Sequence, residues 1–174
     1  MCASDVSGKE VRRVEKLLEL PARITDMEFD GQSFNGLSLM KTLGKLSFEQ
    51  VTTTDTYDGY TVWGIALHLM YWKYDLAEKL GSSKVPDQLP YEKKDWPSLP
   101  ENLSMAEWVK VMDHLREAHT VYIDALAAVD LQRLQETLPA WNCTKEHAIL
   151  WMTTHDAYHT AQIRNMGLKD FNLE

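Results

Sequence analysis

Two histidines, His155 and His159, stand four residues apart in a predicted helix near the end of the 174-residue chain. Side chains four apart on an α-helix project from the same side at about 5–6 Å, so both imidazoles can bind one metal ion. Gln162 lies one turn further along the same side, where it can orient a ligand or contact a substrate. The seam that contains all three residues reads Ala148, Met152, His155, His159, Gln162 and Met166.

A third ligand has to come from another helix, and His68 is the first candidate. It lies between Leu67 and Leu69 in the most apolar helical stretch of the chain. An imidazole without a partner there costs roughly 1–3 kcal/mol. Three imidazoles leave at least one coordination position open for water or substrate, as in catalytic metal sites. Such an ion lowers the pKa of bound water, or of a bound thiol, toward neutrality.

Several other side chains compete for a part in this chemistry. His119 is the rival third ligand, and its simpler interpretation is a core histidine bonded to a Tyr or a backbone carbonyl. His114 is predicted to face solvent, and His147 to belong to the start of the last helix. Asp75, two turns after His68, either orients a ligand imidazole or is a solvated carboxylate. The bland alternative for the whole group is a set of buried, hydrogen-bonded histidines without a metal.

Long helices have to position these residues, and the chain predicts four of them. Four of the six prolines fall within 82–103, which predicts an irregular crossover between the second and third helices. The count predicts an all-α fold, a single four-helix bundle domain over residues 1–174. The predicted segments are a first arm in two pieces, which starts at a capping box at Ser7, is ended or kinked by Pro21 near Leu20 and resumes over 37–46; a helix from Thr61 to Leu80 before Gly81; a helix from Ser104 to Val129; and a helix from Asn142 or Thr144 to Met166 before Gly167.

Composition excludes several classes of function. The formal net charge is −8 and the pI about 5.2, so the chain lacks the basic surface of a nucleic-acid binder. No run of apolar residues reaches the ~18 that a membrane helix needs, and the first ten residues have no apolar signal core. We therefore expect a cytoplasmic protein without nucleic-acid or membrane partners.

Other catalytic motifs are missing from the sequence. No Glu-x-x-His, Gly-rich phosphate loop, Gly-x-Ser-x-Gly or Cys-x-x-Cys is present. Cys143 lies beside a predicted helix N-terminus that can lower a thiol pKa. Because no basic partner for Cys143 is identifiable, we expect it to play no part in the chemistry.

Four stretches of the chain resemble the DinB/YfiT-like superfamily in order and over about residues 34–168. The second contains His68, and the fourth contains His155 and His159. In the last motif this chain has Ala161 where the family commonly has Gly before the Gln. The stretches are FNGLSLMKTLGKLSFEQ (34–50), YTVWGIALHLMYWKYDLAEKL (60–80), KKDWPSLP (93–100) and HDAYHTAQI (155–163).

This resemblance implies a four-helix bundle in up-down-down-up order and a homodimer. It also implies a metal site on His68, His155 and His159, with nickel or zinc as the first expectation and manganese or iron as others. Characterised relatives include thiol-dependent transferases, which add a low-molecular-weight thiol to an electrophile, and a mycothiol-dependent isomerase.

Three functional hypotheses follow. The first is a metal-dependent enzyme of the thiol S-transferase type, with a hydrolase as its variant if an activated water replaces the thiol. Its electrophile is expected in a pocket between the bundle end and the 82–103 crossover, with Tyr71, Trp72 and Tyr158 as walls and Gln162 nearby. The second is a non-catalytic metal- or ligand-binding bundle related to stress. The third is a bundle whose histidines are ordinary core residues.

Overall fold

The structure is a computed structural model, and it describes residues 18–172. Helices dominate this part of the chain, which confirms the all-α class. The elements are, in chain order, a helix over residues 18–29, α2 (Leu39–Leu43), α3 (Phe48–Thr52), α4 (Val62–Lys79), α5 (Met105–Ala128), the 3-10 turn η1 (Leu131–Arg133), β1 (Thr137–Leu138), the 3-10 turn η2 (Pro139–Trp141), β2 (Cys143–Thr144) and α6 (Lys145–Asn165).

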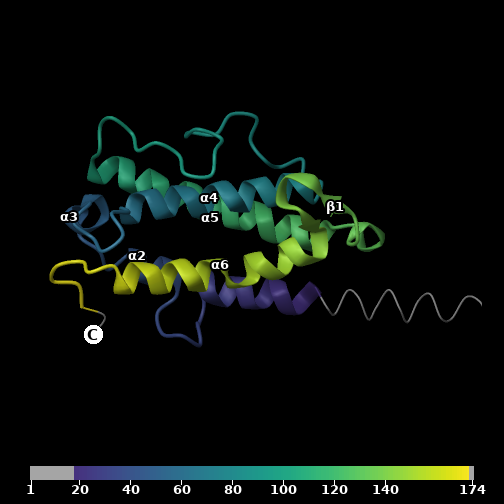
Figure 1. Cartoon of the computed structure of the whole chain (residues 1–174), viewed down its shortest axis with the longest axis horizontal. Helices are drawn as coiled ribbons and strands as arrows, with labels where there is room; N and C mark the ends of the chain where they lie inside the picture. Colours follow the sequence, from purple (N-terminus) through teal and green to yellow (C-terminus); the bar gives the residue numbers. More distant parts are fainter. Residues whose placement is uncertain (1–17, 173–174) are drawn as a thin grey trace, which may run out of the picture.

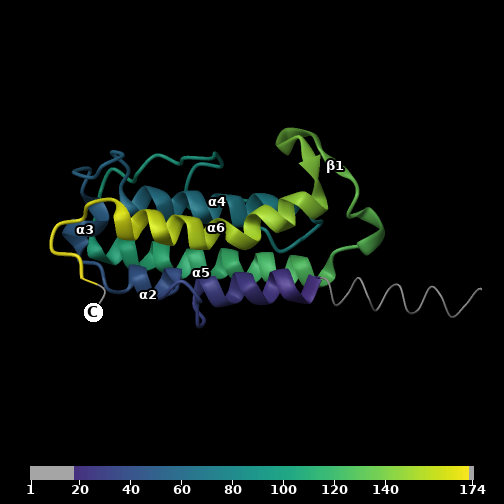
Figure 2. The same cartoon turned by 60° about the horizontal axis from the view of Figure 1, so that its bottom comes forward.

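The long helices lie side by side along the longest axis of the molecule (Figures 1 and 2). Residues 80–104 contain no helix or strand and return along the outside of α4, so that α4 and α5 begin at the same end while α6 begins at the other (Figure 1). The predicted crossover over 82–103 is therefore confirmed. The arrangement is compatible with the predicted up-down-down-up bundle, which stays a prediction.

Helix α4 lies in the middle of the packing, against both α5 and α6. Apolar residues on all sides of a helix favour such a central position. Trp63, Ile65, Leu67 and Leu69 are fully buried, and His68 is buried with them. The first histidine of the predicted group is thus held on the best-packed helix of the fold.

The helix ends follow the predicted capping chemistry. The Thr61, Ser104 and Thr144 side chains each accept a hydrogen bond from a backbone N–H in the first turn of α4, α5 and α6. Gly81 and Gly167 have φ values of 98° and 85°, a region that favours glycine after a helix. The predicted capping box at Ser7 lies outside the described residues.

The first arm differs from the prediction. The helix over 18–29 runs through Pro21 without ending, and the Thr25 hydroxyl donates to the Pro21 carbonyl oxygen inside it. The predicted piece over 37–46 is shorter, because α2 ends at Leu43. A separate helix, α3, follows after the capping box of Ser47 and Gln50, which the sequence analysis did not single out.

A short ladder was also not predicted. The two-residue strands β1 and β2 pair antiparallel, Leu138 opposite Cys143, and η2 forms the loop between them. Two residues are too few for a visible alternation of polar and apolar side chains. This ladder is important for the site because it presents η2 to the beginning of α6.

Among the described residues, no helix is both long enough and apolar enough to cross a membrane.

Candidate metal centre

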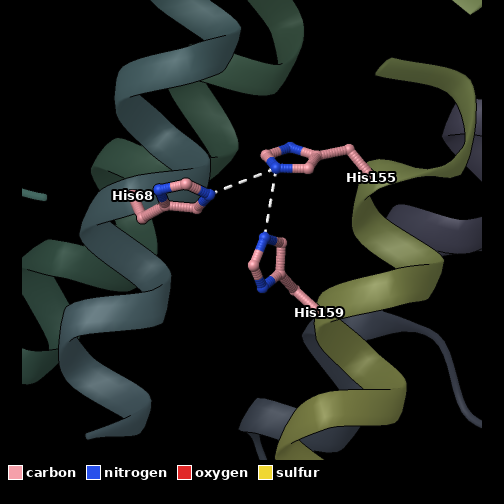
Figure 3. Close-up of side chains that lie close together, drawn as sticks. All are labelled: His68, His155 and His159. Carbon is pink, nitrogen blue, oxygen red and sulfur yellow. Dashed lines mark hydrogen bonds between the residues drawn. The ribbon is translucent and has the colours of Figure 1, made fainter. Parts of the chain in front are cut away.

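The fold brings His68, His155 and His159 together, as the sequence predicts. His68 reaches across from α4, and the other two come from adjacent turns of α6, with their rings pointing toward one another (Figure 3). The Nε2 atom of His155 lies 3.2 Å from Nε2 of His68 and 3.1 Å from Nε2 of His159. One ligand atom from each residue lies within 4.8 Å of the others, so the three form a group that can hold one metal ion.

The second ring nitrogens of two histidines are held by oxygen acceptors. Nδ1 of His68 lies 2.8 Å from the Asp95 carboxylate, and Nδ1 of His159 lies 2.8 Å from Oε1 of Gln162. An oxygen acceptor of this kind requires an N–H donor. In the neutral imidazoles, Nε2 of both His68 and His159 is therefore a bare lone pair aimed at His155.

The protein alone does not satisfy these lone pairs. A proton on Nε2 of His155 can be donated to one neighbour, and the other neighbour's lone pair then has no donor among the described residues. A cation at the point where the three Nε2 atoms converge accepts all three lone pairs. The observed Nε2 spacings are close to the roughly 3.3 Å expected for two imidazoles on one tetrahedral ion with bonds of 2.0–2.1 Å. The residues present thus fit a divalent metal.

Burial keeps these imidazoles neutral. It lowers the pKa of His155 from 6.5 to about 2, with the neighbouring histidines acting in the same direction. Burial also lowers the pKa of His159 to about 4, and that of His68 below 6.5 although Asp95 opposes the shift. Because neutral imidazole is the form that binds metal, no proton competes for the site near neutral pH.

The 82–103 crossover supplies a residue that the sequence analysis missed. Asp95 accepts from Nδ1 of His68, and its Oδ1 atom also accepts from the Trp72 indole N–H at 2.6 Å. Trp96 stacks on the His68 ring with centroids 4.1 Å apart. The motif KKDWPSLP contains both residues, but nothing in it indicates which helix they cover.

Asp75, the predicted alternative for orienting a ligand imidazole, has other partners. It is buried, it pairs with Lys79, and its Oδ2 atom accepts from the Trp141 indole N–H at 2.9 Å. It is neither a histidine partner nor a solvated carboxylate. Its position two turns after His68 places it past the site, beside η2.

The four residues predicted to contact a substrate lie in different places. Trp72 borders both the His68 ring and a cavity described below. Gln162 orients His159. Tyr158 is 65% exposed with its ring edge against His159, and it lines a separate groove between α6 and residues 28–37. Tyr71 is half-buried against Trp72 and does not line the cavity.

The rival ligand His119 lies apart from the group. Its Nε2 atom is 2.8 Å from the Asp26 carboxylate, and its ring stacks on Phe29 at 3.8 Å. It is thus a core histidine, bonded to a carboxylate instead of the expected Tyr or carbonyl. His114 is partly exposed beside Glu117, and His147 is exposed in the first turn of α6.

Cys143 is a free, buried thiol in β2. Burial raises its pKa, which is the opposite of the lowering that a helix N-terminus can cause. A thiol with a raised pKa is a poor nucleophile at neutral pH. The expectation that it plays no part in the chemistry is therefore unchanged, for a different physical reason.

A cavity of about 270 Å³ adjoins the group. The predicted pocket wall was the 82–103 crossover, but the described lining comes from α4, η2 and α6 instead. Trp141 and Trp151 were not predicted here. Trp151 precedes His155 by four residues, a spacing that could have identified it, whereas nothing local in the sequence indicates Trp141. The lining residues are Trp72, Ala140, Trp141, Trp151, Met152 and His155.

Comparison with known proteins agrees with this geometry. A family model of the DinB superfamily matches residues 38–163, which is more than half of the chain and includes all three histidines. The chain belongs to the DinB superfamily, whose members typically bind metal. No curated protein and no solved structure matches the chain significantly.

Proposed function

We propose that this chain is a metal-dependent enzyme built on an up-down-down-up four-helix bundle. His68, His155 and His159 hold one divalent ion, and the enzyme transfers a low-molecular-weight thiol to an electrophile. The observation that carries the proposal is the convergence of Nε2 atoms whose lone pairs have too few donors within the described protein. A divalent ion bound there supplies an acidified ligand, thiol or water, at neutral pH.

The described surroundings favour the thiol over water as the nucleophile. Hydrolysis by a metal-bound water commonly uses a nearby carboxylate or imidazole as general base. The residues that line the cavity include no carboxylate, and Asp95, which contacts His68, is occupied by His68 and Trp72. A thiol needs no such base, because it attacks as thiolate.

The chain's own residues hold and protect this chemistry. Asp95 and Gln162 fix the tautomers of His68 and His159, so that both present a lone pair to the ion. Trp96 covers the His68 ring and excludes water from that side. With an epoxide as electrophile, a carbon–sulfur bond forms, a carbon–oxygen bond breaks, and the released oxygen takes up the proton that the thiol lost.

The first test is the metal content of protein purified without a His-tag or added metal, measured by mass spectrometry. We expect near-stoichiometric divalent metal, lost in the His155→Ala/His159→Ala double variant. His114→Ala is the matched control, because it removes a partly exposed imidazole of α5 and should retain the metal. A wild-type protein that holds no metal and takes up neither zinc, nickel nor manganese overturns the proposal.

The second test separates the possible activities of the loaded protein. Loss of free thiol from cysteine or glutathione with styrene oxide, dependent on the metal, supports the transferase. Hydrolysis of 4-nitrophenyl acetate without any thiol transfer indicates the hydrolase. A loaded protein inactive with a broad panel of both substrate types indicates the non-catalytic binding protein.

A further inference from the structure

The cavity beside His155 offers a ligand almost only aromatic and aliphatic surface. Three of its six lining residues are tryptophans, and Met152 and Ala140 supply most of the rest. None of the lining side chains carries a formal charge while His155 is neutral. Because His155 belongs to both the cavity and the histidine group, a molecule in the cavity lies next to the metal centre.

Hydrogen bonds outside the cavity fix two of the three indoles. The Trp72 N–H donates to Asp95, and the Trp141 N–H donates to Asp75, which is itself held by Lys79. An indole has one donor, so neither ring has a hydrogen bond left to offer a ligand. The two rings meet nearly at right angles, 88°, with centroids 4.8 Å apart. They form a rigid aromatic corner.

We propose that this cavity binds an uncharged aromatic group of the substrate, equivalent to one substituted ring or two fused rings. The inference rests on the proposed function, since it assigns the substrate of the same centre. A cavity of roughly 150 Å³ already accommodates benzene, so about 270 Å³ leaves room for a ring and its substituents. Aromatic rings favour the stacked and edge-on contacts that such a corner provides.

Charged ligands fit the cavity less well. In metal-free protein an anion would lose its water without gaining a hydrogen-bond donor from Trp72 or Trp141, and the carboxylates of Asp95 and Asp75, which accept from these two indoles, would repel it. A cation would gain attraction from the ring faces. In metal-loaded protein, however, it would lie beside the divalent ion on His155, and like charges at that separation repel.

Trp151 forms the open side of the cavity. Trp151 is 55% exposed, which is unusual for tryptophan, although it immediately precedes the buried Met152 on α6. A bound aromatic group would cover part of this ring. Trp151 is therefore the best position for a substitution that weakens binding without disturbing the core.

Three probes of nearly equal shape test the assignment: methyl phenyl sulfone, benzenesulfonate and phenyltrimethylammonium, which are neutral, anionic and cationic. Binding is followed through the indole N–H signals of ¹⁵N-labelled protein, with Trp72, Trp141 and Trp151 assigned from single Trp→Phe variants. We expect the sulfone to shift the Trp141 and Trp151 signals in a saturable way. The anionic probe should bind about tenfold or more weakly than the sulfone to chelator-treated protein, and the cationic probe about tenfold or more weakly than the sulfone to metal-loaded protein.

Trp151→Ala should weaken binding of the sulfone by about tenfold, since it removes one aromatic contact. The matched control is Leu150→Ala, which truncates the neighbouring exposed apolar residue of α6 outside the cavity lining and should leave the affinity unchanged. The inference is overturned if the anion binds chelator-treated protein, or the cation binds metal-loaded protein, as tightly as the sulfone does. The inference is also overturned if the Trp151→Ala variant binds the sulfone as tightly as the wild-type protein.

Metal content measured on the same preparations separates this inference from the proposed function. The walls are protein side chains, so the sulfone should bind both as-purified and chelator-treated protein. Stoichiometric metal with no shift of the tryptophan signals overturns the inference and leaves the proposed function standing. Saturable sulfone binding by a protein that takes up no metal overturns the proposed function and supports the aromatic character of the cavity.

Discussion

The same two helices, α4 and α6, carry two buried polar groups that are built in opposite ways. Lys73 and Asp156 form an ion pair with Nζ and Oδ2 2.7 Å apart, and both side chains are fully buried. Their charges neutralise each other inside the protein. His68 lies five residues before Lys73 on α4, and His155 immediately precedes Asp156 on α6. Together with His159 they form a group of three imidazoles whose Nε2 lone pairs face inward.

We call the ion pair of Lys73 and Asp156 the closed group, and the three histidines His68, His155 and His159 the open group. An ion pair with opposite charges is balanced in charge without any other component, although Oδ1 of Asp156 has no hydrogen-bond partner among the described residues. Three convergent imidazole lone pairs, in contrast, need a cation. The contact of His119 with Asp26 belongs with the closed kind, since Nε2–H of the imidazole donates to the carboxylate, although Nδ1 of His119 has no hydrogen-bond partner among the described residues. Burial alone therefore does not identify a binding site. The convergence of several like ligand atoms on one point does.

The largest expected effect is a loss of stability of the metal-free protein in acid. The folded pKa values of His155, His159 and His119 are about 2, 4 and 4, and that of His68 is also lowered, whereas the ordinary value is 6.5. Between these values the unfolded chain binds more protons than the folded one. Stability is therefore full above pH 6.5 and is lost as the pH falls below it, by up to about 1.4 kcal/mol per pH unit for each histidine.

Urea unfolding of chelator-treated protein at pH 7.5, 6.5, 5.5 and 5 measures this effect. We expect the free energy of unfolding to fall by several kcal/mol over the series. His155→Leu/His159→Leu should flatten the decline, because it removes two of the titrating groups. A wild-type profile that stays flat from pH 7.5 to 5 would contradict the neutral, buried state of the histidines.

Breaking the closed group should have the next largest effect. Lys73→Met leaves the Asp156 carboxylate buried without its counter-charge, and the free energy of unfolding should drop by about 3–5 kcal/mol. The double variant Lys73→Met/Asp156→Leu removes both charges and should regain most of that loss. If Lys73→Met unfolds at the same urea concentration as wild type, the pair is not the self-contained unit described above.

Metal addition should stabilise only through the open group. Zinc at a free concentration of one hundred times its Kd should raise the free energy of unfolding by about 2.7 kcal/mol. The same zinc should stabilise Lys73→Met by a similar increment and His155→Leu/His159→Leu by none. Equal stabilisation of the histidine double variant would place the ion somewhere else on the protein.

The sequence predicted the open group better than its surroundings, for physical reasons. The His155–His159 spacing and the apolar neighbours of His68 are local features, and helix geometry converts them directly into a shared site. The partner of His68 is not local, because Asp95 lies in an irregular crossover whose path depends on packing. Asp75, at helical spacing from His68, was the natural candidate and proved to hold Trp141 instead.

The same limit explains the wall of the cavity and the missed elements. Trp141 reaches the site through a two-residue ladder, β1 with β2, that is too short to leave a periodic pattern. Pro21 was predicted to end or kink its helix, but the helix does not end there and continues to residue 29. Tertiary packing can override the preference of a single residue. Helix ends fixed by a side-chain cap, such as Thr61 and Ser104, were predicted correctly since their chemistry is local.

The smallest expected effect comes from substituting Asp95, which contacts a histidine of the open group without being a metal ligand itself. Asp95→Asn keeps the shape of the side chain but removes its negative charge. In the wild-type protein that charge holds Nδ1–H of His68 and makes Nε2 of His68 a stronger metal ligand. The affinity for zinc, measured by competition with a chelator of known strength, should fall by about 10- to 100-fold. The free energy of unfolding of the metal-free protein should change far less.

Asp75→Asn is the matched control for this change. Asp75 and Asp95 each accept an indole N–H beside the same cavity, but of the two only Asp95 contacts a histidine. If the carboxylates act only by holding Trp141 and Trp72, the two variants should weaken zinc binding equally. If Asp95 orients a ligand of the open group, zinc affinity falls in Asp95→Asn alone, because a group completed by an external ion depends on the exact direction of each lone pair.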